Sequence, residues 1–363
     1  MTKGGTMKKI YLFVILFFMV TLLNAKVWYV HPDSTIAYIQ EGLDSCATGD
    51  TVLVGPGEYY ENLYWPNTQG ILLVSELGAD TTIIDGAQMD RVITLDTGVD
   101  SSSRISGFTI QYGYGTTGAG VYCDNSSPII EYCRIINNEA NGGYGGGGIG
   151  CVNHSSPVIR YCHITNNQSD ATGGGVLCYD YSSPLLHADY IGNNTGDPGA
   201  GISIAYGCFP LIDSCTLINN IGDGIYCGGG DAAVNYCNIQ DNTGYGLRNG
   251  DPNFTIDAEN NWWGDPNGPG GVGPGSGDEV SQWVDYSPWL NEPVGGVTEK
   301  EVVFPSDIDK GATIISGPLF LPLDQHYTIY DITGRRVSAH NLEPGVYFLE
   351  AKDCRVRKIV KIR

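Results

Sequence analysis

The middle of the chain is a repeat of slowly decreasing length, and this repeat limits the possible folds more than any other feature. Six rows align, with starts spaced 28, 27, 26, 23 and 22 residues apart, at Gly120, Gly148, Gly175, Gly201, Gly224 and Gly246. Each row holds two short β-prone segments separated by Ser, Pro, Asn or Gly turns. A period in the twenties with short strands predicts a solenoid whose coils hydrogen-bond to their neighbours about 4.8 Å away. A leucine-rich repeat would show a leucine pattern that is missing here.

Asparagine recurs at one register of these rows. Pairs stand at 137/138, 166/167, 193/194 and 219/220, and Asn242 and Asn260 continue the series. Amides stacked along a solenoid axis bond to one another and hold the turn in which they lie. We therefore predict a structural asparagine ladder.

The rows resemble those of a known family. GVYCDNSSPIIEYCRIINN, from Gly120, and GIGCVNHSSPVIRYCHITNN, from Gly148, are similar to repeats of the pectin-lyase-like superfamily. IQEGLDSCATGDTVLVGPGEYYENL, from Ile39, is similar to the start of that fold, where a short helix caps the open end, and the segment from Glu259 to Leu290 is similar to its exit. The resemblance covers 27–290. It implies an all-β chain built on a right-handed parallel β-helix, and it says little about function, because one fold hosts many chemistries.

The N-terminus has the pattern of a secretory signal. Lys8 and Lys9 precede an apolar run from Ile10 to Leu23, and Ala25 is a candidate cleavage residue. We expect residues 1–25 to be a signal peptide that directs export. An uncleaved N-terminal anchor is the alternative.

The C-terminus differs from the repeat. After a linker at 291–303, the region 304–363 is typical of short strands with turns at Thr333-Gly334 and Pro344-Gly345. Its last part, YTIYDITGRRVSAHNLEPGVYFLEAKDCRVRKIVKIR, resembles the C-terminal sorting domain of the bacterial type IX secretion system. The resemblance implies a small β-sandwich-like domain that engages the secretion machinery and places the protein outside the cell, secreted or at the outer-membrane surface. An ordinary small β-sandwich module is the alternative.

Charge separates the two regions. The chain has 19 Lys and Arg against 40 Asp and Glu, a formal net charge of −21. Between 27 and 290 stand 30 acids, five arginines and no lysine, whereas 291–363 holds ten charges of each sign. An acidic body repels nucleic acid and anionic membranes. We expect a monomer without a nucleic-acid partner that contacts a polysaccharide or a cell-surface glycan.

Eleven cysteines, an odd number, occur in the chain. Eight share two registers, Cys123, Cys151, Cys178 and Cys227 in one and Cys133, Cys162, Cys215 and Cys237 in the other. Export favours disulfides, but stacked residues point the same way and hold their Cβ atoms further apart than a bridge prefers. We predict buried free thiol ladders, with disulfides as the alternative. A CxxC metal motif is missing.

Two registers carry candidate chemistry. Asp170, Asp197 and Asp223 each stand three residues past an asparagine pair. In stacked coils they predict a row of oxygens for a hard cation such as Ca²⁺, with splayed, solvated loops as the alternative. Arg160, His187 and Asp213 share another register, which is either an acid/base site or a solvated face with ion pairs between coils.

Aromatic residues supply the remaining candidates. Tyr112, Tyr114, Tyr144 and Tyr245 lie in Gly-rich loops, where tyrosine serves as a stacking platform for sugar rings. Trp262 and Trp263 either stack on sugars or cover the exposed end of the helix core.

These features favour a protein without strong catalysis. The Asp-Asp and Gly-His motifs of polygalacturonases and a lysine base are missing from the body. We predict an exported bacterial surface protein whose β-helix is non-catalytic and binds glycans or acts as a scaffold or adhesin. The alternative is a Ca²⁺-dependent polysaccharide lyase of the pectate-lyase-like type. Its base would be one of the body's five arginines, at 91, 104, 134, 160 and 248.

Overall fold

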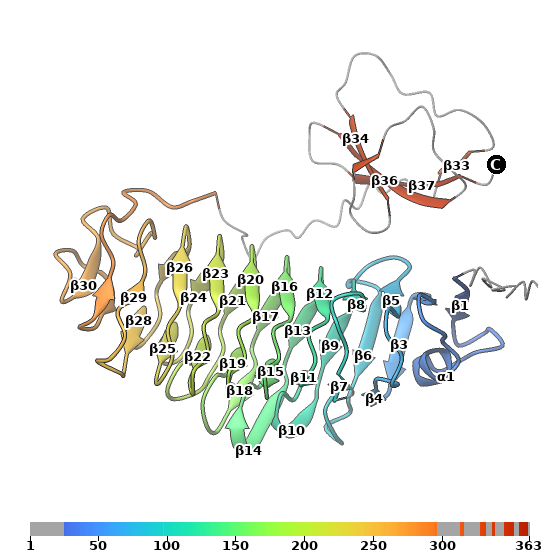
Figure 1. Ribbon diagram of the computed structural model, residues 1–363, viewed down its shortest axis with the longest axis horizontal. Coiled ribbons are helices and arrows are strands. Elements are labelled where there is room, and N and C mark those ends of the chain that lie inside the picture. Colours follow the sequence, from blue (N-terminus) through green and yellow to red (C-terminus); the bar gives the residue numbers. More distant parts are fainter. Residues whose placement is uncertain are drawn as a thin grey trace, which may run out of the picture.

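The computed structural model describes residues 25–96 and 98–295 in full, and the backbone of five strands between 313 and 361. The first part is a parallel β-helix in which successive coils stack along one axis (Figure 1). The predicted signal peptide and most of the predicted linker lie outside the described residues. No helix in the described part is long and apolar enough to cross a membrane.

Three sheets form the sides of the β-helix. Sheet A has eleven strands, β1 (Val27–Val30), β2 (Thr51–Val54), β5 (Leu72–Ser75), β8 (Arg104–Ser106), β12 (Ile129–Glu131), β16 (Val158–Arg160), β20 (Leu185–His187), β23 (Leu211–Asp213), β26 (Ala233–Asn235), β29 (Ile256–Asp257) and β32 (Val284–Asp285). Sheet B has eight, β3 (Gly57–Tyr60), β6 (Thr82–Asp85), β9 (Thr109–Gln111), β13 (Arg134–Ile136), β17 (His163–Thr165), β21 (Tyr190–Gly192), β24 (Thr216–Ile218) and β27 (Asn238–Gln240). Sheet C has ten, β4 (Leu63–Tyr64), β7 (Ile93–Leu95), β11 (Val121–Asp124), β15 (Ile149–Val152), β19 (Val176–Cys178), β22 (Ile202–Ile204), β25 (Ile225–Cys227), β28 (Leu247–Asn249), β31 (Gly277–Val280) and β30 (Pro269–Gly271).

Side chains stack on their equivalents in the next coil. In sheet A, Ile130 pairs with Ile159, Ile159 with Leu186, and Leu186 with Ile212. All four are fully buried, because alternate residues of a strand point to opposite faces. Each coil thereby covers the apolar side chains of its neighbour and excludes water from the core.

The asparagine pairs divide two tasks between them. The first member, such as Asn137 or Asn193, adopts a left-handed conformation with φ of 56°, which asparagine tolerates better than most residues. The second member is buried, and its amide bonds to the next coil. The Nδ2–Oδ1 distances are 3.0 Å from Asn138 to Asn167, 3.1 Å from Asn167 to Asn194, 3.1 Å from Asn194 to Asn220 and 2.9 Å from Asn220 to Asn242.

The predicted ladder is confirmed up to Asn242 and is wrong for Asn260. Asn242 donates from Nδ2 to Asp278 Oδ2 over 2.7 Å, so a carboxylate ends the ladder. Asn260 belongs to a different turn, where its carbonyl accepts the N–H of Tyr236 over 3.1 Å. Asn260 follows the sheet A strand β29, whereas the asparagines of the ladder follow strands of sheet B. The Asn-Asn pair at 260/261 therefore marks a different turn of the coil.

The predicted thiol ladders are also found. The ten described cysteines are free, and all except Cys46 are buried. Cys123 pairs in register with Cys151, and Cys151 with Cys178. In the second register, a carboxylate interrupts the thiols between Cys162 and Cys215. This residue is Asp189, whose neighbours in the ladder are set by hydrogen bonds from Tyr190 N to Cys162 O and from Thr216 N to Asp189 O.

Both ends of the β-helix are covered. The helix α1 (Ile39–Asp44) buries Ile39 and Leu43 over the first coils, as the sequence predicted. At the other end Trp263 is fully buried in the core. The chain then folds back over the last coils, where Val294 N donates to Asn238 Oδ1 over 2.9 Å.

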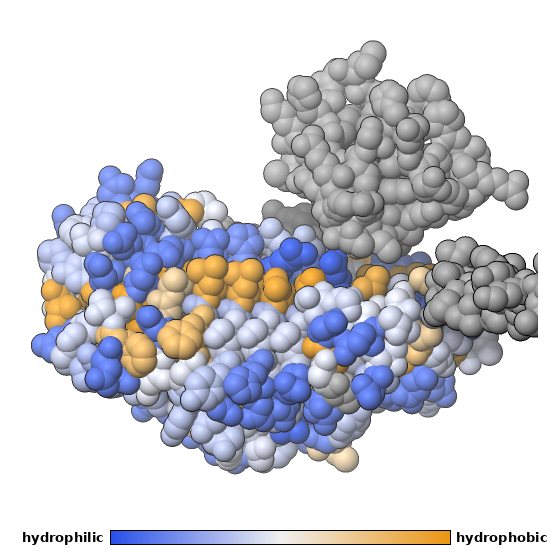
Figure 2. Space-filling view, in the orientation of Figure 1, coloured by the Kyte–Doolittle hydropathy of each residue, from blue (hydrophilic) through white to orange (hydrophobic). Residues whose placement is uncertain are grey.

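The outer face of sheet A carries an apolar band along the axis (Figure 2). Ile129, Val158, Leu185 and Leu211 pair in register to form it. Ile129, Val158 and Leu185 are half-buried and Leu211 is exposed. The first three side chains are therefore partly covered by their neighbours in the band.

The five C-terminal strands form one mixed sheet, in the order β33 (Thr313–Ile315), β37 (Val356–Lys361), β36 (Gly345–Ala351), β34 (Tyr327–Asp331) and β35 (Arg336–Val337). β33 pairs parallel with β37, and the other pairings are antiparallel. The described strands do not include the second sheet that the predicted sandwich requires.

Candidate functional site

The candidate site is built on a column of outward-facing residues at the C-terminal ends of the sheet C strands. Backbone hydrogen bonds run from Tyr179 N to Cys151 O (2.9 Å), from Ala205 N to Cys178 O (3.0 Å), and from Gly228 N to Ile204 O (2.7 Å). These bonds place Tyr179, Ala205 and Gly228 in one column on the outer face. Small residues fill much of this column, which leaves room for aromatic rings from neighbouring positions.

Three tyrosine rings follow one another along this column; the first two are stacked, and the second and third are tilted by 52°. The ring of Tyr144 lies 4.2 Å from that of Tyr179, and the ring of Tyr179 lies 4.6 Å from that of Tyr206. Tyr144 comes from β14 (Glu139–Gly145), which pairs with β10 (Tyr114–Thr117) and β18 (Gln168–Ser169) in a small sheet of loops. This loop sheet approaches sheet C closely at Gly150, where an added Cβ would lie 2.8 Å from Gly118 N.

Two further tyrosines lie in the neighbouring outward column, two residues earlier in each strand. A Cβ at Gly228 would lie 2.5 Å from the ring of Tyr226, so this ring covers glycine backbone. At the other end Tyr122 donates its hydroxyl to Asp124 Oδ2 over 3.1 Å. We call Tyr122, Tyr144, Tyr179, Tyr206 and Tyr226 the tyrosine row. It follows five consecutive coils, roughly 19 Å at about 4.8 Å per coil.

Two phenols of the row, those of Tyr179 and Tyr122, have raised pKa values and keep their protons at physiological pH. Partial burial, followed by the neighbouring phenols of Tyr144 and Tyr206, raises the pKa of Tyr179 to about 12. Burial and then the carboxylate of Asp124 raise the pKa of Tyr122 to about 12. The row therefore offers uncharged ring faces and hydroxyl groups.

An arginine ends the row. The guanidinium carbon of Arg248 lies 4.7 Å from the ring centre of Tyr226 and 6.0 Å from that of Tyr245. Its Nε lies 2.7 Å from Asp223 Oδ2, and its Nη2 lies 3.9 Å from Oδ1 of the exposed Asp197. Burial raises the pKa of Asp223, against the opposing effects of the Tyr245 N–H and Arg248.

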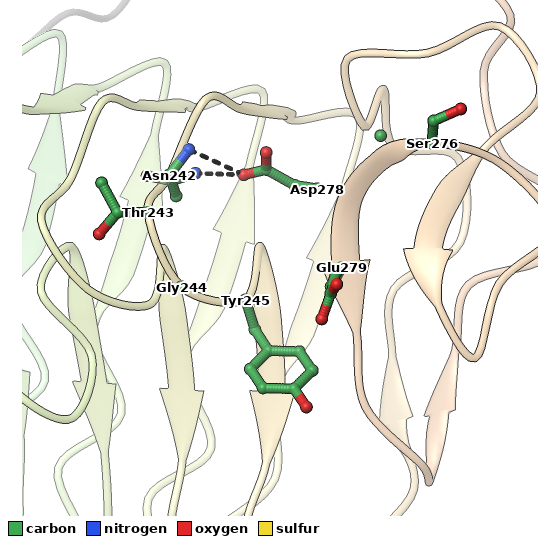
Figure 3. A pocket seen from close by; sticks show the side chains of 8 residues that line it. Asn242, Thr243, Gly244, Tyr245, Ser276, Asp278 and Glu279 are labelled. Atoms are coloured by element: carbon green, nitrogen blue, oxygen red, sulfur yellow. Dashed lines mark hydrogen bonds between the residues drawn. The ribbon is translucent and has the colours of Figure 1, made fainter.

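An open pocket of about 370 Å³ lies beside Tyr245 (Figure 3). Its lining includes Tyr245, Asp278 and Glu279. Asp278 is turned to Asn242, whose N and Nδ2 both donate to its Oδ2. Tyr245 and Glu279 extend side by side away from that contact. They add a ring and a carboxylate to the end of the row.

The predicted row of calcium ligands is not assembled. Asp170 Oδ1 accepts the Gly142 N–H over 2.7 Å, whereas Asp197 and Asp223 face Arg248. Within the described ranges, no three His, Cys, Asp or Glu side chains are grouped to hold a metal ion. The reason is that the loops differ in length, so equal spacing from the asparagines does not give equal positions in space.

The predicted acid/base register exists on sheet A, where Arg160 pairs with His187 and His187 with Asp213. Its charges form two separate sets. Arg160 donates through Nε and Nη2 to Glu131 Oε2 over 2.8 and 2.6 Å, and Arg104 binds the other oxygen of Glu131. His187 Nδ1 lies 2.8 Å from Asp213 Oδ2.

These contacts hold Arg160 in its charged form. Burial acts to lower the pKa of Arg160, but the hydrogen bond and charge of Glu131 outweigh it and raise the pKa. A guanidinium in this state is a poor base, so the arrangement matches the ion-pair interpretation of this register.

The six aromatic candidates fall into three groups. Tyr144 lies in the row and Tyr245 at its end. Tyr112 and Tyr114 are exposed near β10, outside the row. Trp262 and Trp263 are buried, and Trp262 Nε1 donates to Gln240 Oε1 over 2.8 Å. Neither tryptophan offers a ring face to a sugar, so their interpretation as cover for the core is the one that fits.

Sequence analysis missed four tyrosines of the row, at 122, 179, 206 and 226. A signal was present, since each follows the glycine that opens a repeat by two to five residues. Assigning alternate positions of those strands to the outer face would have found Tyr122 and Tyr226.

Comparisons with known proteins concern the fold. Residues 95–262 match the family model of the right handed beta helix region. A solved structure of similar fold is the crystal structure of pectate lyase Pel9A, at 13% sequence identity and a TM-score of 0.38, covering 73% of this chain and 79% of that one. No curated protein matches this sequence.

Proposed function

We propose that this chain is an exported, non-catalytic β-helix protein that binds a polysaccharide along the tyrosine row. The observation that carries the proposal is the row of tyrosines over five coils, in which the rings of Tyr144 and Tyr179 are stacked and those of Tyr179 and Tyr206 are tilted against each other. Tyrosines with an apolar ring and a polar hydroxyl suit ligands that are apolar on one face and polar at the edge, as sugar rings are.

The rest of the surface agrees with binding rather than catalysis. The arginine of the acid/base register is held by Glu131, and its neighbour His187 is bound to Asp213. The row suits a polymer better than a small substrate, because it extends over five coils. The open pocket at its end would not enclose a small molecule.

Export is the second part of the proposal. It rests on the Lys8-Lys9 pair and the apolar run after it, together with the C-terminal resemblance to a sorting domain. Fractionation of cells expressing the full chain would test it, with deletion of residues 1–25 as the control. Retention of the intact chain in the cytoplasm would contradict export.

The test of binding is a substitution in the row. In the full chain, Tyr179→Ala and Tyr206→Ala should each weaken binding of a polysaccharide roughly tenfold, corresponding to about 1.4 kcal/mol. Affinity electrophoresis through gels containing single polysaccharides would measure this loss. Tyr236→Ala is the matched control, because Tyr236 is comparably exposed on the turn between sheets A and B. An equal loss in the control would place binding elsewhere.

A Ca²⁺-dependent lyase is the second candidate, and Arg248 is the observation that favours it. Arg248 lies beside two carboxylates and two tyrosine rings, and one of these rings, that of Tyr245, lines an open pocket. Uronic-acid polysaccharides incubated with and without Ca²⁺ would reveal a lyase by the absorbance of unsaturated products. A Ca²⁺-dependent signal that Arg248→Gln abolishes and Arg160→Gln retains would replace the non-catalytic proposal.

A further inference from the structure

The charges around the tyrosine row restrict which polysaccharide fits it. We propose that the ligand is an uncharged polysaccharide and that polyuronates are rejected. This inference rests on the proposed function, and it names the chemical class of the ligand.

The first step concerns the cations that an anionic glycan would need. The β-helix has no lysine between Val27 and Gly295. Arg104 and Arg160 share Glu131, Arg134 pairs with Asp80, and Arg248 pairs with Asp223. Arg91 stacks on Tyr122 with Cζ 4.1 Å from the ring centre, while its Nε donates to Thr117 O over 2.7 Å. Four of the five arginines are thus engaged by carboxylates, and Arg91 is held against the ring of Tyr122.

The second step concerns the anions beside the row. Asp124 accepts the hydroxyl of Tyr122 and, over 2.7 Å, the amide of Asn153. At the opposite end the Asp197 side chain is 94% exposed, and Glu279 lines the pocket. A chain carrying one carboxylate per sugar would meet these charges within a Debye length of about 8 Å at physiological ionic strength.

The third step separates neutral from cationic glycans. An amino-sugar polymer carries a cation on each sugar and needs carboxylates along its whole path. Asp223 is paired with Arg248, whereas Asp124 and Asp197 lie at opposite ends of the row. The centre of the row, from Tyr144 to Tyr206, consists of uncharged rings in contact with one another, stacked in the first pair and tilted in the second. An uncharged sugar chain can contact this centre because neither the sugars nor the tyrosines need an oppositely charged partner.

The test compares four probes on the full chain, mixed-linkage β-glucan, arabinoxylan, polygalacturonate and chitosan, by affinity electrophoresis at low and high salt. We expect a neutral probe to be bound at least tenfold more tightly than polygalacturonate, with little salt dependence. Tyr179→Ala should abolish that preference and Tyr236→Ala should keep it.

Each other outcome has a defined meaning. Tighter binding of polygalacturonate or of chitosan would overturn this inference and leave glycan binding intact. Binding of none of the four probes would contradict the proposed function itself. The charge reversal Asp197→Lys provides a further check, because it should increase polygalacturonate binding in low salt. No increase in that variant would show that charge at this end does not select the ligand.

Discussion

Asp189 is a carboxylate in the apolar interior, in register with cysteines. The residue is fully buried, its Oδ1 accepts the N–H of Cys162 over 2.7 Å, and its Oδ2 has no hydrogen-bond partner in the described structure. Asn261 occupies the same register at the end of the column, where its Nδ2 donates to Val234 O over 2.6 Å. A protonated Asp189 would have an O–H donor at the position where Asn261 has its Nδ2 donor. Burial raises the pKa of Asp189 to about 8, and the backbone N–H donors oppose this effect.

This pKa predicts a pH dependence of stability. An unfolded Asp loses its proton near pH 3.9, whereas folded Asp189 keeps its proton to about pH 8. The contribution of protonated Asp189 to the free energy of unfolding is therefore complete below about pH 4. It is lost as the pH rises to about 8, by up to about 1.4 kcal/mol per pH unit. Asp189→Asn should be more stable than the natural chain above pH 4, with a margin that grows toward pH 8.

Urea unfolding at a series of pH values would measure this margin. Asp197→Asn is the control, because the Asp197 side chain is exposed, and its margin should stay near zero. A margin for Asp189→Asn that does not change with pH would show that Asp189 is ionised in the folded state.

At the scale of the element, the asparagine ladder joins five coils. Asn194 accepts two hydrogen bonds from Asn167 and donates to Ile164 O and to Asn220 Oδ1. Its removal leaves several buried polar groups without partners, each costing about 1–3 kcal/mol. Its neighbour Asn193 instead provides the left-handed turn.

The two members of the pair should respond differently to substitution. Asn194→Ala should lower the free energy of unfolding by about 3 kcal/mol or more, because buried donors and acceptors lose their partners. Asn193→Gly should change it by less than about 1 kcal/mol, because glycine adopts positive φ without strain. Chemical denaturation monitored by circular dichroism would measure both. Equal effects would contradict the division of tasks within the pair.

For the whole molecule, the net charge of −21 sets a repulsive background. Salt screens repulsion between exposed charges, with a Debye length falling from about 30 Å at 0.01 M to about 8 Å at 0.15 M. We expect added NaCl over this range to raise the melting temperature by about 2–4 °C, equivalent to about 1 kcal/mol. Scanning calorimetry would measure the shift. A decrease would mean that ion pairs such as Arg160–Glu131 outweigh the repulsion.

The sequence by itself determined the solenoid, its cap, the thiol ladders and most of the asparagine ladder. These features depend on register within a repeat, and the register can be counted along the chain. The pairing of Arg160 with His187, and of His187 with Asp213, was predictable for the same reason.

Only the tertiary structure decided which side chains meet outside the strands. Tyr144 reaches Tyr179 from a loop that folds over sheet C, and Arg248 meets Asp197 and Asp223 across coils of unequal length. Such contacts depend on loop path and side-chain reach, which a repeat does not fix. For this reason Asp170, Asp197 and Asp223 do not share one position in the stacked coils, and the contacts of the tyrosine row depend on how the coils stack.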